Sequence, residues 1–124
     1  MRALHLVFAA LFAVSAALQY NDPDPVGWAL LYLAATALAI GAWRRAGWTR
    51  LLAFVVIAVC AAWMATLLPG FGAFVARRDP ALLAATMKAG DPVIEEAREF
   101  LGLGIVLAYA LAANVLAALL RTAR

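Results

Sequence analysis

Residues 51–68 read LLAFVVIAVCAAWMATLL and contain no charged side chain. A helix that crosses a hydrocarbon core of about 30 Å needs about 20 predominantly apolar residues, so this run is long enough to span a membrane. Three further apolar runs have a similar length: Ala3–Tyr20, Val26–Trp43 and Phe100–Leu120. Lipid offers no hydrogen-bond partner to backbone amides, so each run is expected to form a helix.

The composition argues against a water-soluble domain. Of the 124 residues, 68% are hydrophobic and 14% are charged, whereas a soluble domain carries about 25% charged residues. The net charge of +3 comes from residues that lie mainly between the apolar runs, so it indicates membrane topology rather than nucleic-acid binding. We therefore predict an all-α protein, an integral membrane antiparallel four-helix bundle in which residues 1–124 form a single transmembrane domain.

Basic residues flank the apolar runs on one side of the predicted membrane. They are Arg2, Arg44, Arg45, Arg50, Arg121 and Arg124. The gap after the first run has only Asp22 and Asp24 as charged residues, and by the positive-inside rule it faces outward. We expect a multi-pass protein of the cell inner membrane with both termini in the cytoplasm. Arg77 and Arg78 lie in the third gap, which this orientation places outside, and they do not follow the rule.

The first apolar run also fits a secretory signal peptide. Arg2 would be its basic start, and the small residues Ser15, Ala16 and Ala17 would lie near the cleavage site. We expect this run to be retained as a membrane helix.

Two Asp-Pro pairs in the third gap predict helix starts. Asp79-Pro80 and Asp91-Pro92 each place a capping carboxylate before a proline at the first helical position. The first pair predicts a short helix over residues 80–89 that lies along the membrane interface. The second pair predicts a helix that runs through the fourth apolar run and is longer than the hydrocarbon core is thick.

Polar residues gather in two segments, QYNDPDP at residues 19–25 and EEARE at residues 95–99. The predicted orientation puts both segments on the outer face, where the helix ends of a compact bundle lie within reach of each other. Glu95, Glu99 and Gly102 share one stripe of the fourth helix. We predict a binding site for a cation or a polar head group, formed by Gln19, Asn21, Asp22, Asp24, Glu95, Arg98 and Glu99.

The carboxylates of this set are candidate metal ligands. They are Asp22, Asp24, Glu95 and Glu99. Because all four offer oxygen, Ca²⁺ or Mg²⁺ is expected rather than zinc or copper. The acids also have a structural interpretation, in which they cap helix starts and form a salt-bridged lid with Arg98. Both interpretations stay open at this point.

No catalytic residues are predicted, and a non-enzymatic role is favoured. The single histidine, His5, lies on the predicted cytoplasmic side, and the single cysteine, Cys60, lies inside an apolar run. The alternatives are a metal-dependent membrane enzyme that acts on lipid and a purely structural or accessory subunit. Proton-coupled transport needs an ionisable residue deep in the membrane, and no apolar run has one at its centre. The expected partners are the lipid bilayer and a second copy of the chain or another membrane protein, without nucleic acid.

Polar residues within the runs form a separate group. They are Ser15, Thr36, Thr66 and Asn114. Such residues often hydrogen-bond across helices in membranes, so we expect them to join neighbouring helices.

The two polar segments also resemble a known family. The matching pattern is Gln19-x-Asn21-Asp22-Pro23-Asp24 with Trp28 and Tyr32 following, and Glu95-Glu96-x-Arg98-Glu99-x-x-Gly102-Leu103. In this pattern and its spacing the chain resembles the transmembrane protein 220 family of small multi-span proteins, and it looks like a bacterial-type member. The resemblance covers most of the chain but implies no particular reaction. It implies that the signature polar positions are Asn21, Asp22, Asp24, Glu95, Arg98 and Glu99.

Overall fold

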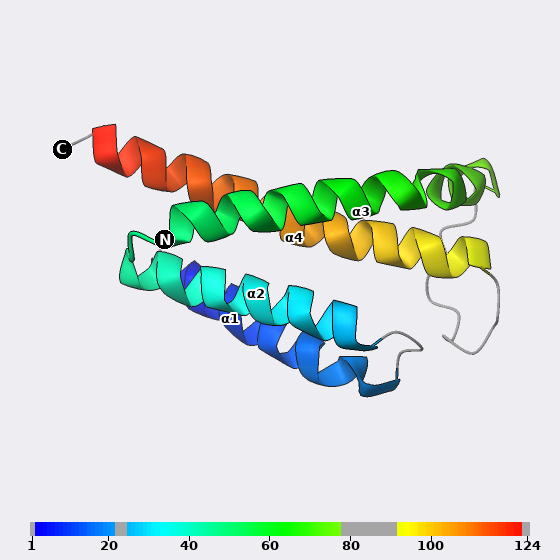
Figure 1. The fold of residues 1–124 in the computed structure, drawn as a ribbon, viewed down its shortest axis with the longest axis horizontal. Helices are drawn as coiled ribbons and strands as arrows, with labels where there is room; N and C mark the ends of the chain where they lie inside the picture. Colours follow the sequence, from blue (N-terminus) through cyan, green and yellow to red (C-terminus); the bar gives the residue numbers. More distant parts are fainter. Residues whose placement is uncertain (1, 22–24, 78–91, 123–124) are drawn as a thin grey trace.

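The computed structural model describes residues 2–21, 25–77 and 92–122. Over these ranges it contains four α-helices, α1 (Arg2–Ala17), α2 (Pro25–Arg44), α3 (Thr49–Arg77) and α4 (Pro92–Thr122), and a 3-10 turn, η1 (Leu18–Asn21), that extends α1 (Figure 1). The all-helical class predicted from the sequence is confirmed. The helix predicted over residues 80–89 lies outside the described residues.

Helix lengths follow from the apolar runs and their prolines. Three helices are long and apolar enough to cross a membrane: α2, α3 and the part of α4 from Glu96 to Leu119. α1 has 16 residues, which is about 24 Å at 1.5 Å per residue and shorter than the hydrocarbon core. Pro25 and Pro92 each stand at a first helical position, where a backbone N–H is not needed. The helix start that the Asp91-Pro92 pair predicts is confirmed.

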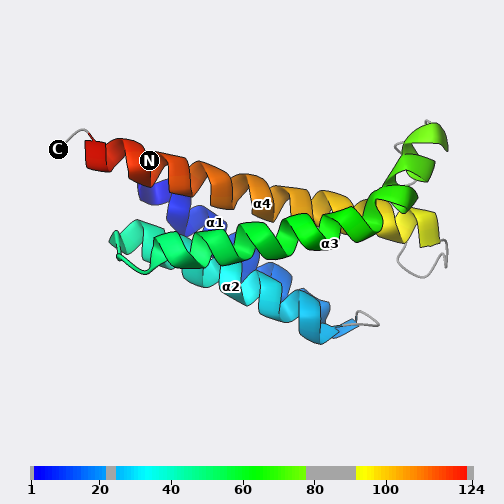
Figure 2. The same cartoon turned by 45° about the horizontal axis from the view of Figure 1, so that its top comes forward.

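The helices form two hairpins. α1 packs along α2, α3 packs along α4, and α2 joins the two pairs by contacting α3 and α4 (Figure 1). The hairpins lie close together where α2 ends and α3 begins, and they diverge towards the end where α2 begins and α4 begins (Figures 1 and 2). This second end is the one that holds the polar segments of interest.

Small and aliphatic residues build the core. Ala35, Ala39 and Ala110 are completely buried in one cluster with large buried side chains such as Leu38 and Leu103. Small residues let helix backbones approach closely, which matters in lipid because the hydrophobic effect does not drive helices together there. No polar or charged side chain among the described residues is fully buried.

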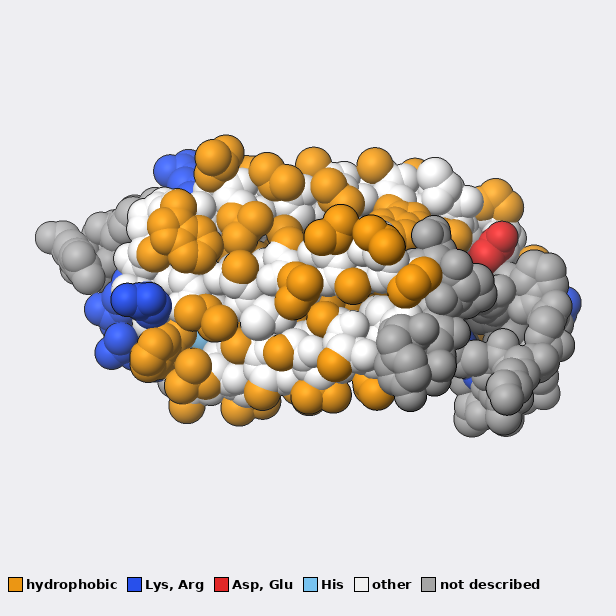
Figure 3. All heavy atoms as spheres, turned by 60° about the horizontal axis from the view of Figure 1, so that its bottom comes forward, with side chains coloured by type: hydrophobic (Ala, Val, Ile, Leu, Met, Phe, Trp, Pro, Cys, Tyr) orange, Lys and Arg blue, Asp and Glu red, His pale blue; other side chains and the backbone are white. Residues whose placement is uncertain are grey.

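The outer surface of the helices is largely apolar. Large hydrophobic side chains such as Leu30, Leu51 and Val115 are more than half exposed. In Figure 3 hydrophobic side chains are spread along the whole described part of the visible face, and basic side chains gather at its left end. An apolar surface of this extent would promote aggregation in water, and it is suited to contact with lipid.

The turn between α2 and α3 is held by defined contacts. The N–H of Ala46 bonds to the Gly41 carbonyl (2.9 Å), and Arg45 takes the left-handed conformation with φ of 57° that such a helix end requires. The Arg2 Nε donates to the Trp43 carbonyl (3.1 Å), and the Arg2 guanidinium lies 5.6 Å from the centre of the Trp43 ring. A cation at the carbonyl end of a helix is favourable, so these contacts of Arg2 stabilise the packing of α1 against the end of α2.

α3 continues past the apolar run 51–68. Pro69 lies inside the helix, which extends to Arg77. Proline lacks the N–H that would bond to the Ala65 carbonyl, and its ring crowds that carbonyl, so a bend is expected there. Figure 2 shows the last turns of α3 turning away from the axis of the preceding part.

The hydroxyl groups within the apolar runs bond inside their own helices. Ser15 donates to the Leu11 carbonyl (2.8 Å), Thr36 to the Tyr32 carbonyl (2.8 Å) and Thr66 to the Trp63 carbonyl (2.6 Å). The predicted role of these three residues as links between helices is therefore wrong. A hydroxyl can satisfy its hydrogen bond within the preceding turn, which needs no neighbouring helix.

Candidate binding site

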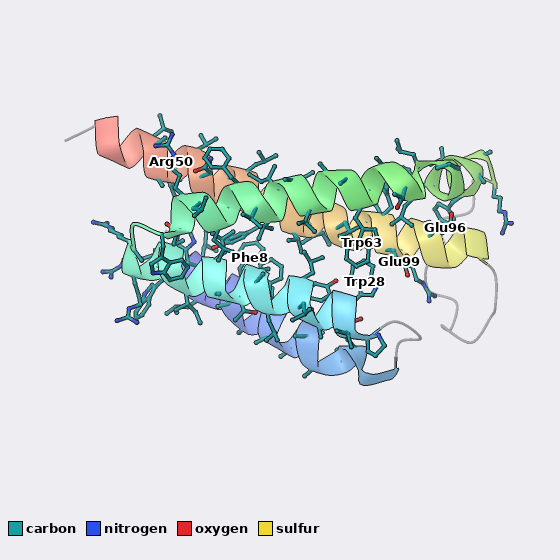
Figure 4. The ribbon with its side chains drawn as sticks, in the orientation of Figure 1. Phe8, Trp28, Arg50, Trp63, Glu96 and Glu99 are labelled. Atoms are coloured by element: carbon teal, nitrogen blue, oxygen red, sulfur yellow. The ribbon has the colours of Figure 1, made fainter. Side chains whose placement is uncertain are left out.

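Charged side chains of α4 gather in its first turns. Glu96, Arg98 and Glu99 are partly buried, and Ala97 between them is completely buried. The apolar segment of α4 that is able to span a membrane begins at Glu96, so these charges lie at its edge. In Figure 4, Glu96 comes first along α4 and Glu99 second. The Trp28 and Trp63 side chains lie just beyond Glu99.

Glu96 packs against the bend of α3. A Cβ atom added to Gly70 would lie 2.6 Å from the Glu96 Cδ and 2.7 Å from its Cβ, so only a glycine fits there without a shift. Gly70 is itself buried and directly follows Pro69. The bend of α3 and the missing side chain at position 70 together make room for the Glu96 side chain. Sequence reasoning included Glu96 in the polar segment but did not select it as a ligand.

A pair of tryptophans joins the hairpins just inside these charges. The Trp28 and Trp63 ring centres are 4.5 Å apart, and Trp28 is also 6.1 Å from the Tyr32 ring. Trp63 passes over α2 at Gly27, where an added Cβ would be 3.5 Å from its ring. The pair therefore closes the apolar interior directly below the polar end of α4 (Figure 4).

The predicted site residues are described to different extents. The Gln19 Nε2 donates to the Ser15 carbonyl (2.9 Å), and Arg98 and Glu99 are placed on α4 as above. Asn21 lies in η1, but its side chain and that of Glu95 lie outside the described part. Asp22 and Asp24 lie wholly outside the described residues. The meeting of the two polar segments therefore remains a prediction.

A metal centre is not formed by the described residues alone. Among them no group of three or more histidine, cysteine, aspartate or glutamate side chains is placed to hold a metal ion. Cys60 is completely buried in the core, which fits packing rather than metal binding. Any hard cation at this end would need carboxylates from residues 22–24 or Glu95, as the sequence predicts.

A polar pair that the sequence did not reveal lies near the opposite end. The His5 Nδ1 and the Tyr109 hydroxyl are 2.7 Å apart, and their rings meet edge to face at 6.0 Å. Phe8 and Phe12 pack on the same tyrosine, with ring centres at 4.7 and 5.5 Å. Because 104 residues separate His5 from Tyr109, no local pattern could have indicated the pair.

A groove of about 190 Å³ lies between α1, α2 and α4. Its lining residues are Phe8, Leu11, Phe12, Ser15, Tyr32, Gly102 and Ile105. Gly102 keeps it open next to Tyr32, because an added Cβ would be 3.3 Å from the Tyr32 hydroxyl. Gly102 follows Glu99 by three residues, and Ser15 precedes Gln19 by four, so the groove begins about one helical turn from the predicted site.

Comparison with protein families finds a match over most of the chain. The model described as "Transmembrane family 220, helix" matches residues 11–115, which run from the middle of α1 almost to the end of α4. The chain belongs to this family. The resemblance noted in the sequence is confirmed, and the matched range includes both polar segments. Comparisons with curated proteins and with solved structures find no match.

Membership of transmembrane family 220 accounts for the apolar surface. Together with three helices able to span a bilayer, it establishes a membrane protein in contact with lipid.

Proposed function

We propose that this protein binds a cation or a polar head group at the end of the bundle where α4 begins. The observation that carries the proposal is the partial burial of Glu96, Arg98 and Glu99 within one turn at the edge of a membrane-spanning segment. Partly burying charged groups costs several kcal/mol unless opposite charges or hydrogen bonds compensate. Arg98 and Glu99 each already have an interaction within the protein, and a bound cation or a charged head group would add to that compensation.

The proposed ligand set extends beyond the described residues. Gln19 and Glu99 would approach the carboxylates of Asp22, Asp24 and Glu95 when the two polar segments meet. Carboxylate and amide oxygens suit Ca²⁺ or Mg²⁺. The role is binding or accessory rather than catalytic.

The proposed topology has four antiparallel spans in the cell inner membrane, with both termini in the cytoplasm and residues 80–89 as an interfacial helix outside. Four exposed arginines support this orientation: Arg2, Arg44, Arg45 and Arg50. α1 is short for a span, and η1 adds one further turn to it.

The orientation predicts the accessibility of labels. With Cys60 replaced by alanine, a cysteine introduced at Gly47 should react with an impermeant maleimide only from the cytoplasmic side. A cysteine introduced at Asn21 should react only from the outside, because successive loops of a multi-span helical protein lie on opposite sides of the membrane. Labelling of whole cells and of inside-out vesicles provides the measurement. Reaction of both cysteines from one side would rule out the four-span arrangement.

Ion binding predicts a gain in thermal stability. Saturating Ca²⁺ or Mg²⁺ should stabilise the wild type in detergent by about 2.7 kcal/mol at a free concentration of about 100 times Kd. Asp22→Asn and Glu99→Gln should each abolish this gain, because each removes a charged oxygen ligand. Melting curves followed by tryptophan fluorescence, with and without the ion, provide the measurement.

Asp79→Asn is the matched control, since it removes a carboxylate outside the proposed site. It should leave the ion-dependent gain unchanged. An unchanged wild-type melting temperature after addition of either ion would remove the metal part of the proposal and favour a head group or a salt-bridged lid.

A further inference from the structure

Four exposed arginines gather at the end of the bundle where α2 ends and α3 begins. They are Arg2 at the start of α1, Arg44 and Arg45 at the end of α2 and in the turn after it, and Arg50 at the start of α3. Basic side chains collect at the left end of the molecule in Figure 3, and Figure 4 labels Arg50 at that same end. These four residues are called the arginine cluster below.

Contacts between helices hold the arginine cluster in place. The Arg2 Nε donates to the Trp43 carbonyl in the last turn of α2 (3.1 Å), which brings the start of α1 to this end. A Cβ added to Gly41 would lie 2.5 Å from the Trp48 ring, so the turn that leads into α3 packs closely on α2. The four arginines therefore form one surface on folded elements.

The charge of the arginine cluster is not balanced at its own end of the described structure. All seven acidic residues of the chain fall within residues 22–24 and 79–99. The described carboxylates of Glu96 and Glu99 lie at the opposite end, where α4 begins (Figure 4). A surface with charge of a single sign attracts ligands of the opposite sign, so this end favours anions.

Exposed apolar side chains adjoin the arginine cluster. Leu51, directly after Arg50, is 71% exposed, and Trp48 is 52% exposed. The Arg50 guanidinium lies 5.8 Å from the centre of the Phe54 ring, so it extends along the apolar surface of α3. A phospholipid carries its phosphate directly next to its acyl chains and can contact both kinds of side chain. A soluble anion would leave the apolar side chains without a partner.

We propose that the arginine cluster is a binding surface for anionic phospholipid, whose phosphate oxygens accept hydrogen bonds from the guanidinium groups. Guanidinium and phosphate match in geometry as well as in charge, because two parallel N–H groups can bond to two phosphate oxygens. This surface lies at the opposite end of the bundle from the cation or head-group site proposed above. Neither proposal depends on the other.

Fluorescence quenching by brominated lipid tests the proposal. The full chain is placed in phosphatidylcholine nanodiscs with a rising share of phosphatidylglycerol that carries bromine on its acyl chains. Phosphatidylglycerol bound at the cluster should quench the exposed Trp48 beside it. Brominated phosphatidylcholine, whose choline group cancels the phosphate charge, is the reference. Because each arginine near a membrane surface contributes roughly fivefold in affinity, phosphatidylglycerol should bind about tenfold or more tightly than phosphatidylcholine.

The double variant Arg44→Gln/Arg45→Asn should lose most of this preference, leaving less than about threefold. It removes two charges and keeps the contact of Arg2 with Trp43. Asparagine is tolerated in the left-handed conformation that Arg45 adopts, with φ of 57°. The tryptophans at the opposite end of the bundle meet the same lipid in both proteins, so the change in quenching reports on the cluster.

Arg77→Gln is the matched control. Arg77 is an exposed arginine at the end of α3 opposite to Arg50, and it already has an interaction within the protein. Its replacement should leave the preference for phosphatidylglycerol unchanged. Equal quenching of the wild type by the two lipids would overturn the proposal. The same loss of preference in Arg77→Gln as in the double variant would also overturn it.

The wild type alone provides a second test, which does not depend on the folding of a variant. Raising NaCl from about 50 to about 500 mM should weaken quenching by phosphatidylglycerol and leave quenching by phosphatidylcholine unchanged, because salt screens exposed charges. A preference that salt does not reduce would contradict binding by the arginines. Sodium phosphate should compete no better than NaCl of the same ionic strength. Stronger displacement by phosphate would indicate a site for a free anion, and displacement by micromolar hexaglutamate would indicate an acidic protein partner; either result would overturn the lipid assignment.

Discussion

Replacing Gly70 with valine is expected to destabilise the protein by about 3 kcal/mol, the upper end of the usual cost of overpacking. The Cβ atom alone would lie 2.6 Å from the Glu96 Cδ and 2.7 Å from its Cβ, closer than real contacts allow. One of these atoms is attached directly to the backbone of α4, so a change of Glu96 rotamer cannot clear it. Relief would require α3 and α4 to move apart at the bend. Denaturation by increasing mole fractions of SDS, followed by circular dichroism, provides the measurement.

Gly72→Val is the matched control for this substitution. Gly72 lies in the same last turns of α3, and a Cβ added there would meet no atom within 4 Å. It carries the same helix-propensity change as Gly70→Val, and the difference between the two variants isolates the contact with Glu96. Combining Gly70→Val with Glu96→Ala should recover part of the loss, because the Glu96 carboxylate is removed and its Cβ remains. Equal stability of the two valine variants would contradict the Glu96–Gly70 packing.

Phe12→Ala should also cost about 3 kcal/mol, the lower end for a buried phenylalanine. Phe12 is 3% exposed, and its ring lies 5.5 Å from that of Tyr109 and 6.4 Å from that of Tyr32. It therefore links α1 to α4 and α2 at once. Removing the ring leaves a cavity, and lipid does not compensate for the lost packing contacts inside the protein. SDS denaturation followed by circular dichroism measures the loss.

Val14→Ala provides the comparison on the same helix. Val14 is 58% exposed, so in a bilayer its side chain contacts lipid in the folded protein. It still contacts lipid when the protein unfolds within the membrane, so little packing is lost. Its replacement should change stability by only a few tenths of a kcal/mol, within the range of surface substitutions. A loss for Phe12→Ala no larger than that of Val14→Ala would show that the aromatic cluster does not join α1 to the other helices.

Most of the helical architecture could be predicted from local sequence. The apolar runs predicted the four described α-helices, and the proline after Asp91 predicted the start of α4 at Pro92. The end of α3 was less predictable, because Pro69 removes only one backbone hydrogen bond and the residues after it remain apolar. The three hydroxyls in the spans were misassigned because intrahelical and interhelical bonds have the same sequence pattern.

The candidate site was predictable in part. The acidic and amide residues stand out in an apolar chain, and the family match includes both of their segments. Glu96 was placed in the cluster by sequence, but its contact with Gly70 depends on a bend and on a helix far away along the chain. The predicted meeting of Asp22 and Asp24 with Glu95 and Glu99 remains to be tested by the ion-dependent melting experiment.

Sequence alone determined that this protein is helical and membrane-bound, because hydrogen bonding in lipid demands helices and apolar length sets which of them can span. It also determined which residues can carry charge. Tertiary structure alone decided that Glu96 fits against Gly70, that His5 meets Tyr109, and that Gly102 opens a groove beside Tyr32. Nearly uniform apolar faces leave the rotation of each helix undetermined, so these contacts depend on how small and aromatic side chains fit between helices.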